Sequence, residues 1–464
     1  MLYTDFINAK RHTSISNGIE VSFLPDALFD FQKYLTEYAI NKGRCGIFLD
    51  TGLGKTIIEL TIAHNYTKKT NKPVLILTPL AVAFQFILEA EKFKIPDVYH
   101  TKDGNYKGKG KIILVNYERL HYMNAKDFDC VILDESSILK NYEGQIKNHV
   151  TDFLKKVKYR FLFTATPSPN DYIELGTSSE ALGYLGYTDM LGQFFKNNQN
   201  NTIKLSRTAQ SRQGEKWYLK PHAEQAFWNW VSSWSKSAKK PSDLGFSDDK
   251  FTLPQLIEQQ TIVRNPTPLE KYGMTPLFSF PANGFQEIKK EAKITIEQRC
   301  EIAVEKTKPH PISVYWCLLN DEAKCLSSLD KLAVEINGSM PLEQKEDILH
   351  NFSTGNIKRL ITKPTITAFG LNWQHCNHTT YFPSYSYEQY YQSIRRFWRF
   401  GQKKPVTVDL IYTDGQKNMM KALLIKKEKA ITMFENLIKS ANTPSIISKK
   451  DNIYKEIKLP NFLK

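Results

Sequence analysis

A glycine-rich segment closed by Lys-Thr is the first stretch of this chain whose residues suit a chemical role. The run GIFLDTGLGKT, residues 46–56, joins an apolar, strand-like segment to a helix-like one. Gly52 and Gly54 lack side chains, so backbone N–H groups can approach phosphate oxygens, and the positive end of the following helix favours the same anions. Lys55 would reach the β- and γ-phosphates, and Thr56 would ligate Mg²⁺. The segment therefore predicts a nucleoside triphosphate site; the alternative is an ordinary strand-turn-helix with incidental glycines.

A pair of adjacent carboxylates follows a second apolar run, CVILDESS, residues 130–137. A carboxylate at the end of a buried strand supplies a Mg²⁺ contact, and a second one beside it can activate water. We therefore predict that Asp134 is the metal partner and Glu135 the general base. Acids that cap a strand end and begin a helix would explain either residue alone. Together with the upstream glycine-rich segment, however, the pair indicates nucleotide hydrolysis.

Two arginines lie in a basic, aromatic run near the C-terminus, YEQYYQSIRRFWRFGQ, residues 387–402. Arg396 and Arg399 are three residues apart and so share one face of a helix. Guanidinium groups placed in this way suit the stabilisation of transition-state charge on a γ-phosphate. The alternative is a basic helix on the protein surface.

Short β-branched runs alternate with helix-like segments over the first third of the chain, which is typical of a parallel α/β sheet. From about residue 168 to residue 293 amphipathic and aromatic-rich stretches replace this alternation, and a second alternating set follows. A chain of 464 residues also exceeds what one core usually organises. The predicted division is an N-terminal lobe (1–175), a helical insertion (176–293), a C-terminal lobe (294–445) and a basic tail (446–464).

Further motifs extend over nearly the whole chain. LFDFQKYL (28–35) precedes the glycine-rich segment, and DESSILKN (134–141), FTATPSPND (163–171) and ITKPTITAFGLNWQHC (361–376) follow it. The run 387–402 closely matches the pattern QAxDRxxRxGQ. With these motifs the chain resembles superfamily 2 helicases and translocases of the Swi/Snf-like branch, in the compact form often encoded by bacteriophages. The resemblance implies an α/β fold of two RecA-like parallel-sheet lobes with a helical, aromatic-rich insertion between them.

The same resemblance implies roles for individual residues, with ATP and Mg²⁺ as cofactors. It places on the nucleotide Gln32, Thr51, Gly52, Leu53, Gly54, Lys55 and Thr56, with the Gln32 amide reading adenine. Its catalytic residues are Lys55, Asp134, Glu135, Gln392, Arg396 and Arg399, and its Mg²⁺ ligands are Thr56 and Asp134. The residues that couple hydrolysis to movement are Thr164, Thr166 and Gly370. Two departures stand out, because Arg395 occupies the Asp position of the last motif and Ser136 and Ser137 replace Ala and His of DEAH.

The formal net charge of +15 favours a polyanionic partner, although surface lysine also serves solubility. The resemblance implies an ATP-dependent motor on DNA, duplex rather than single-stranded, in replication, recombination or repair of phage or host DNA. LTPLAVAFQF (77–86) and VNYERL (115–120) would contact the nucleic-acid strand. Two alternatives stay open: a nucleotide-gated subunit that clamps or remodels DNA without separating strands, and an RNA helicase.

Two smaller features have competing interpretations. His375, Cys376 and His378 fit no usual zinc spacing, so a loop of the second-lobe motif is favoured over a metal site. The aromatic segment 216–246 favours core packing over stacking on DNA, with Lys236, Lys239 and Lys240 as the better phosphate contacts.

The six scattered cysteines, without a CxxC pair, predict a reducing compartment. With no apolar leader or membrane span in the sequence, we expect a cytoplasmic protein of a bacterial or phage-infected cell that binds no membrane.

Overall fold

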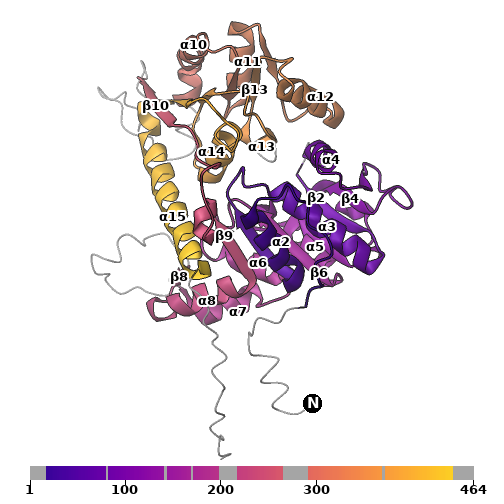
Figure 1. Cartoon of the computed structure of the whole chain (residues 1–464). Helices are drawn as coiled ribbons and strands as arrows, with labels where there is room; N and C mark the ends of the chain where they lie inside the picture. The colour runs from indigo at the N-terminus through magenta and orange to yellow at the C-terminus, as the bar shows by residue number, and fades with distance from the viewer. Residues whose placement is uncertain are drawn as a thin grey trace, which may run out of the picture.

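Two parallel β-sheets, each covered by helices, form the two lobes of the protein (Figure 1). The computed structural model describes residues 17–79, 82–140, 144–168, 171–197, 217–264, 291–367 and 371–442. Of the sequence predictions, Gly370 and the tail 446–464 lie outside these residues. The predicted α/β class and two-lobe architecture are confirmed.

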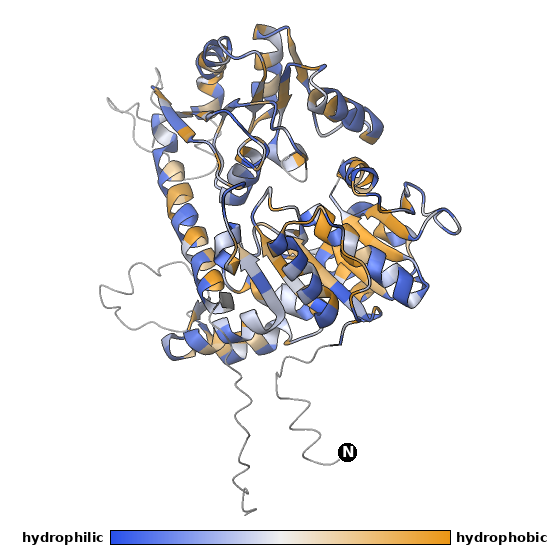
Figure 2. Ribbon diagram, in the orientation of Figure 1, coloured by the Kyte–Doolittle hydropathy of each residue, from blue (hydrophilic) through white to orange (hydrophobic). Residues whose placement is uncertain are grey.

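The first lobe contains a seven-stranded sheet in the order β3-β4-β2-β5-β6-β1-β9. Its strands are β1 (Arg44–Leu49), β2 (Val74–Thr78), β3 (Val98–His100), β4 (Ile112–Asn116), β5 (Cys130–Leu133), β6 (Tyr159–Thr164) and β9 (Ser235–Ala238). Its helices are α2 (Asp30–Lys42), α3 (Lys55–Thr70), α4 (Ala83–Lys92), α5 (Gln145–Lys155), α6 (Glu174–Leu182), α7 (Tyr187–Phe194) and α8 (Glu224–Trp234). A small antiparallel pair, β7 (Phe195–Asn197) with β8 (Trp217–Leu219), lies beside α7 and α8. Most strands of this sheet are apolar, with β9 an exception, and the helices turn polar faces outward (Figure 2).

The second lobe contains a six-stranded sheet in the order β10-β15-β14-β11-β13-β12. Its strands are β10 (Leu256–Val263), β11 (Ser313–Trp316), β12 (Ala333–Glu335), β13 (Arg359–Thr362), β14 (His378–Tyr381) and β15 (Val406–Thr413). Its helices are α10 (Ile296–Thr307), α11 (Asn320–Leu329), α12 (Leu342–Ser353), α13 (Pro364–Thr367), α14 (Tyr387–Ile394) and α15 (Lys417–Asn442).

The segment expected to be an insertion, residues 176–293, contributes a strand to each sheet. Strand β9 pairs in parallel with β1, from Gly46 opposite Ser235 to Leu49 opposite Ala238. Strand β10 pairs in parallel with β15 along its whole length. The sheet boundaries therefore differ from the predicted division, because parallel pairing recruits strands that are distant in the sequence.

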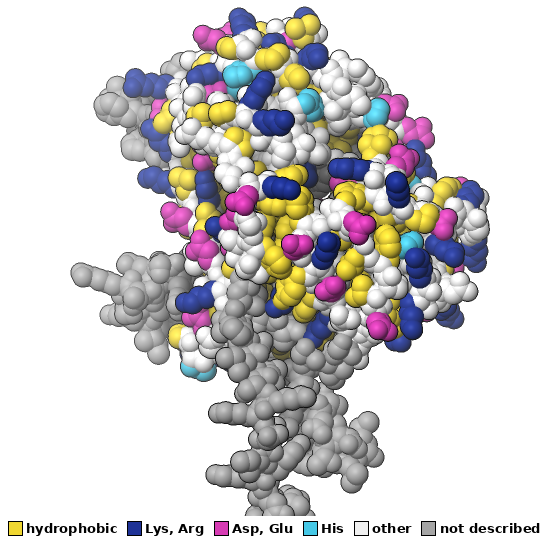
Figure 3. Space-filling view, in the orientation of Figure 1, with side chains coloured by type: hydrophobic (Ala, Val, Ile, Leu, Met, Phe, Trp, Pro, Cys, Tyr) yellow, Lys and Arg dark blue, Asp and Glu magenta, His cyan; other side chains and the backbone are white. Residues whose placement is uncertain are grey.

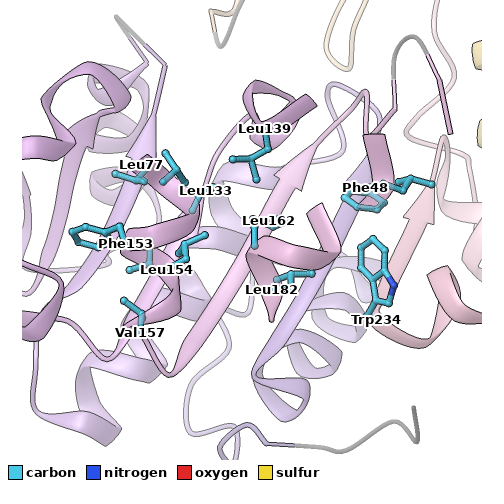
Figure 4. Packing of buried hydrophobic residues seen from close by; sticks show 14 of the residues in the cluster. Phe48, Leu77, Leu133, Leu139, Phe153, Leu154, Val157, Leu162, Leu182 and Trp234 are labelled. Atoms are coloured by element: carbon cyan, nitrogen blue, oxygen red, sulfur yellow. The ribbon is translucent and has the colours of Figure 1, made fainter. Parts of the chain in front are cut away.

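The aromatic residues of α8 pack in the core of the first lobe. Phe227, Trp230 and Trp234 are buried, and the Trp234 ring lies edge-on to Phe48 of β1 with 6.0 Å between ring centroids (Figure 4). The prediction of core packing for this segment is confirmed. Burial of such large rings stabilises the lobe by roughly 1.5–3 kcal/mol each.

Helix α15 connects the lobes along one side of the molecule (Figure 1). Met420 and Leu423, near its start, belong to the second-lobe core, whereas Met433 and Leu437, near its end, belong to the first-lobe core. The helix therefore tethers the two lobes at the side away from α4 and α12.

Within the described residues, no helix is both long enough and apolar enough to cross a lipid bilayer.

Candidate nucleotide site between the lobes

A cleft of about 450 Å³ lies between the lobes and is lined by residues of both. The predicted site residues in its lining are Gln32, Thr51, Gly52, Gly54, Lys55, Thr56, Asp134, Glu135, Arg396 and Arg399. Leu53 instead turns into the first-lobe core, where it is buried. The structure thus brings together the first-lobe and second-lobe residues that the motifs predict, although they are 261 to 367 positions apart in the sequence.

The glycine-rich loop connects β1 to α3 at the carboxyl end of the first sheet. Gly52 and Gly54 have φ angles of 89° and 80°, which glycine adopts without strain. Helix α3 begins at Lys55, and its N-cap residue, Gly54, makes no side-chain hydrogen bond to the helix. The first N–H groups of the helix therefore suit an anion. The Lys55 ammonium donates to the Leu49 carbonyl at 3.1 Å. These features fit the phosphates of a nucleotide.

Gln32 of α2 braces the same loop. Its amide nitrogen donates to the Leu53 carbonyl at 3.0 Å, and its amide oxygen accepts from the Phe29 N–H at 3.0 Å. A Cβ at Gly54 would lie 2.3 Å from that amide nitrogen, so a larger residue there would displace the Gln32 amide. Adenine reading by Gln32 stays a prediction.

The two acids directly follow β5. The Asp134 N–H donates to the Leu77 carbonyl at 2.9 Å, and the Tyr117 hydroxyl donates to the Asp134 carbonyl at 2.6 Å. Burial, and then the neighbouring Glu135, raises the pKa of the Asp134 carboxyl to about 7, while Lys55 opposes the rise. Glu135 has a φ of 51°, an uncommon conformation for a residue with a side chain. Such strain is retained where the surrounding fold enforces it, often at functional sites.

A hydrogen-bonded series runs from Glu135 into the second lobe. The Thr164 hydroxyl at the end of β6 donates to the Glu135 carboxylate at 3.3 Å, and the Thr166 N–H donates to the Thr164 hydroxyl at 3.0 Å. The Gln392 amide nitrogen of α14 then donates to the Thr166 hydroxyl at 3.3 Å. The two threonines predicted to couple hydrolysis to movement therefore lie between the acid and the other lobe.

The two arginines enter the cleft from the second lobe and differ in their partners. Arg396 donates to the Leu371 carbonyl at 2.7 Å, to the Gln392 carbonyl at 3.1 Å and to the Gln392 amide oxygen at 3.0 Å. Arg399 donates to the Leu371 carbonyl at 3.1 Å, and its buried Nε has no partner among the described residues. Burial and Arg399 lower the pKa of Arg396 to about 9, against Glu135 and Asp134, which act in the opposite direction.

Three of the phenylalanines in the lining form one group and were not among the predicted site residues, although Phe29 and Phe400 lie within two of the motifs. Phe251 and Phe400 stack with 4.8 Å between centroids at an interplanar angle of 29°, and Phe29 lies edge-on to Phe251 at 5.0 Å. No local pattern identifies Phe251, which follows a turn-rich stretch of the sequence. The group makes an apolar wall beside Gln32.

A buried carboxylate next to the acids, Glu59, was also missed. Burial raises the pKa of Glu59 on α3 well above its ordinary value, and Asp134 adds to the effect. Both Glu59 carboxylate oxygens lack hydrogen-bond partners among the described residues. The helical spacing of Glu59 four residues after Lys55 is the signal that places it on the same side of α3.

A second cavity of about 520 Å³ lies between α4 and α12. It is lined by Phe84 and Gln85 of the run predicted to contact the nucleic-acid strand, and by His350 of α12. Phe84 and His350 meet edge-on with 4.8 Å between centroids, and Lys102 pairs with Glu346 at 3.4 Å. The lobes therefore also touch at this side of the molecule.

The remaining candidates have partners within the protein. The His378 ring bonds to the Ser313 hydroxyl at 2.8 Å and to Asp409 at 3.0 Å, all three being buried. Lys239 and Lys240 lie within ion-pair distance of Glu435 and Asp248. Lys and Arg are dispersed over the face in Figure 3 with Asp and Glu between them, so the net charge makes no single-sign patch there.

Comparisons with known proteins match two parts of this chain to protein families. Residues 26–169 match the family described as "Type III restriction enzyme, res subunit", and residues 295–401 match the "Helicase conserved C-terminal domain". The "DNA annealing helicase and endonuclease ZRANB3" of Mus musculus is 30% identical over 185 residues, which is 35% of this chain and 17% of that protein.

A second relative comes from Xenopus tropicalis, the "SWI/SNF-related matrix-associated actin-dependent regulator of chromatin subfamily A-like protein 1". It is 30% identical over 174 residues, 35% of this chain and 18% of that protein. The matched region thus spans less than a fifth of either relative. The solved "Sulfolobus solfataricus SWI2/SNF2 ATPase core in complex with dsDNA" aligns over 90% of this chain and 96% of its own at 18% identity, with a TM-score of 0.41.

Proposed function

Because the chain belongs to the Swi/Snf-like branch of superfamily 2 helicases and translocases, we propose that it hydrolyses ATP and uses the energy to move along duplex DNA. The observation that carries this proposal is the cleft that holds Lys55, Asp134 and Arg399 together. A site shared in this way makes hydrolysis depend on how the lobes are placed relative to each other. That dependence is what a motor requires.

The first lobe binds the triphosphate and prepares the attacking water. The loop N–H groups and the Lys55 ammonium hold the phosphates, as a preorganised arrangement of donors does. Thr56 and Asp134, both in the lining, would hold Mg²⁺, whose charge would offset that of the phosphate oxygens. Glu135 orients a water and accepts its proton, and the Thr164 hydroxyl holds the Glu135 carboxylate in place.

The second lobe supplies positive charge for the transition state. Arg399 is the better candidate for the γ-phosphate, because its Nε has no partner among the described residues. Arg396 has its guanidinium committed to Leu371 and Gln392, so it supports the loop and helix that carry Arg399. This division refines the prediction that the two arginines act equally.

The apolar wall made by Phe29, Phe251 and Phe400 suits a purine base. Aromatic rings offer stacking surface at the edge of the cleft where Gln32 lies. Because Phe400 belongs to the second lobe, a base bound there would contact both lobes. We propose that ATP is bound with its base at this wall and its phosphates at the glycine-rich loop.

The choice of duplex DNA rests on family membership and on the names of the relatives, which refer to DNA and chromatin. The cavity between α4 and α12 lies at the lobe junction where the predicted strand-contacting run is located. Replication, recombination or repair of phage or host DNA stays the predicted setting.

Turnover measured with no nucleic acid, single-stranded DNA, duplex DNA and RNA tests the proposal. Duplex DNA is expected to give the largest stimulation, because binding across both lobes favours the arrangement that brings Arg399 to the phosphates. Equal turnover in all four conditions would contradict a motor, and stimulation by RNA alone would identify an RNA helicase. Stimulation by duplex DNA without displacement of a bound triplex strand would favour the DNA-clamping alternative.

A further inference from the structure

Helix α14 turns one face toward the first lobe. The face consists of Glu388, Tyr391, Gln392 and Arg395, which are spaced three or four residues apart as on one side of a helix. Their first-lobe partners are Lys140, Asp50, Thr166 and, for Arg395, both Asp50 and Thr51. Arg395 therefore contacts the phosphate-binding loop directly from the second lobe.

Arg395 and Asp50 form a buried ion pair across the lobes. The Arg395 Nε donates to the Thr51 hydroxyl at 2.6 Å, its guanidinium also donates to the Thr51 carbonyl at 3.3 Å, and it pairs with the Asp50 carboxylate. The side chains of Arg395 and Asp50 are 4% and 13% exposed. The Tyr391 hydroxyl donates to the same carboxylate, and the Trp398 ring lies 4.9 Å from the guanidinium.

The partners of Arg395 lie at the base of the glycine-rich loop. Asp50 follows β1 directly, and its carboxylate accepts the Thr51 N–H at 2.7 Å, which fixes the turn into Gly52. Neither Arg395 nor Asp50 is among the described residues that line the nucleotide cleft. Any effect of Arg395 on the nucleotide must therefore pass through the loop.

The family pattern does not predict this contact. An Asp at position 395, as in QAxDRxxRxGQ, would place a second carboxylate beside buried Asp50, and two like charges at short distance repel. The second lobe also lies close against Gly52 of the loop, because a Cβ at Gly52 would be 2.6 Å from the backbone nitrogen of Phe400. The charge of Arg395 is thus complementary to that of Asp50 in this chain.

We propose that Arg395 is a positioning residue that latches the second lobe to Asp50 and Thr51, so that the protein rests closed before DNA binds and the loop is shaped by that closure. The inference rests on the proposed ATPase function for its catalytic consequence. Its structural consequence, a closed resting state, holds independently.

The distance between the lobes tests the structural consequence without ATP or DNA. Tyr122 and Leu332 are 53% and 71% exposed and lie in different lobes. Spin labels attached at Tyr122→Cys and Leu332→Cys report the distance between the lobes by pulsed electron paramagnetic resonance. Cys325, the one free cysteine of the described residues that is not buried, is changed to Ser in this background. Arg395→Ala and Arg395→Asp are expected to lengthen and broaden the distance distribution relative to the parent protein.

Two further variants guard against misfolding. Arg359→Ala removes a similar arginine–aspartate pair, Arg359 with Asp330 at 2.8 Å, but within the second lobe, and should leave the distance unchanged. The double change of Asp50→Asn with Arg395→Gln leaves no unpaired buried charge, so the chain should fold while the lobes still separate. An unchanged distance in Arg395→Asp and in the double variant would overturn the proposal.

ATP kinetics test the catalytic consequence. Without DNA, Arg395→Ala should raise KM for ATP by a factor between about 5 and 150, the usual range for a coupling between sites. Arg395→Ala should also lower kcat without DNA, and saturating duplex DNA should recover most of that loss, because it brings the lobes together by other contacts. Arg395→Lys, which keeps the charge but loses the forked donors, should have a KM for ATP between those of the parent protein and Arg395→Ala. Equal losses of kcat with and without DNA, at unchanged KM, would identify a merely structural role.

Failure of the proposed function looks different from failure of this inference. If the parent protein does not hydrolyse ATP, the ATPase proposal is wrong while the distance measurement still decides whether Arg395 latches the lobes.

Discussion

The two lobes contribute to the nucleotide cleft in different ways. In the first lobe the phosphate-site groups come after strands of one sheet, Lys55 at the end of the loop that follows β1 and the acids directly after β5. In the second lobe Arg396 and Arg399 come from one short stretch after α14. They donate to Leu371 and, for Arg396, to Gln392, whose amide also donates to Thr166 of the first lobe. The first lobe thus has a preformed binding site, whereas the second completes it only when the lobes are placed correctly.

Among the changes in the preformed half, the largest expected effect is at Lys55. Lys55→Ala should lower turnover by about 10²–10³-fold or more, with or without DNA, because the ammonium is the main first-lobe cation in the phosphate site. Thermal unfolding should change little, since the Lys55 side chain lies in the cleft lining. Steady-state turnover and a melting curve on the same sample check this. Normal turnover, or an unfolded variant, would contradict the assignment of Lys55 to the phosphate site.

The preformed half should also carry a cost in stability. Asp134→Asn should stabilise the nucleotide-free protein near pH 8, because burial and Glu135 raise the pKa of Asp134 from 3.8 to about 7. A raised folded-state pKa means that wild-type stability, relative to the variant, falls as pH rises from about 4 to about 7 and then stays level. The gain at pH 8 should be on the order of 2–4 kcal/mol. Denaturant unfolding across this pH range, without Mg²⁺, measures it; a gain that is independent of pH would contradict the prediction.

Substitutions at two glycines of the loop distinguish contact with the second lobe from strain within the first lobe. Gly52→Ala and Gly54→Ala both place a side chain at a positive φ, which costs about 1 kcal/mol or more. The new Cβ at position 52 meets the backbone of Phe400 in the second lobe, whereas at position 54 it meets the flexible Gln32 amide of the same lobe. We expect Gly52→Ala alone to lengthen the distance between the lobes in the spin-label measurement. The same shift in both variants would mean that strain in the loop, rather than contact with Phe400, separates them.

The first-lobe site could be predicted from the sequence because its determinants are local. A glycine-rich turn between an apolar strand and a helix, or an Asp-Glu pair after an apolar strand, carries its meaning within about ten residues. The predicted Lys55, Thr56, Asp134 and Glu135 all line the cleft.

The rest could not be predicted, because it depends on contacts between distant segments. Strand β9 reads SKSA, which has no β-branched residue, and it becomes a strand only by pairing with β1. Phe251 and the partner of Arg395 are likewise defined by the approach of the lobes. The position of Arg395 was recognised as a departure from the family pattern, but its cause lies at Asp50, 345 residues away.

Nucleotide affinity and DNA-stimulated turnover of Arg399→Ala, measured on one preparation, test most directly whether both lobes share one site. We expect ATP affinity within a few-fold of wild type, since the first lobe holds the phosphates, and turnover lowered by about 10³-fold or more. Arg396→Ala should lose turnover as well, together with thermal stability, because three of its hydrogen bonds support the loop and helix around it. Near-normal DNA-stimulated turnover in Arg399→Ala and Arg396→Ala would contradict the shared site and leave the two arginines with a structural role alone.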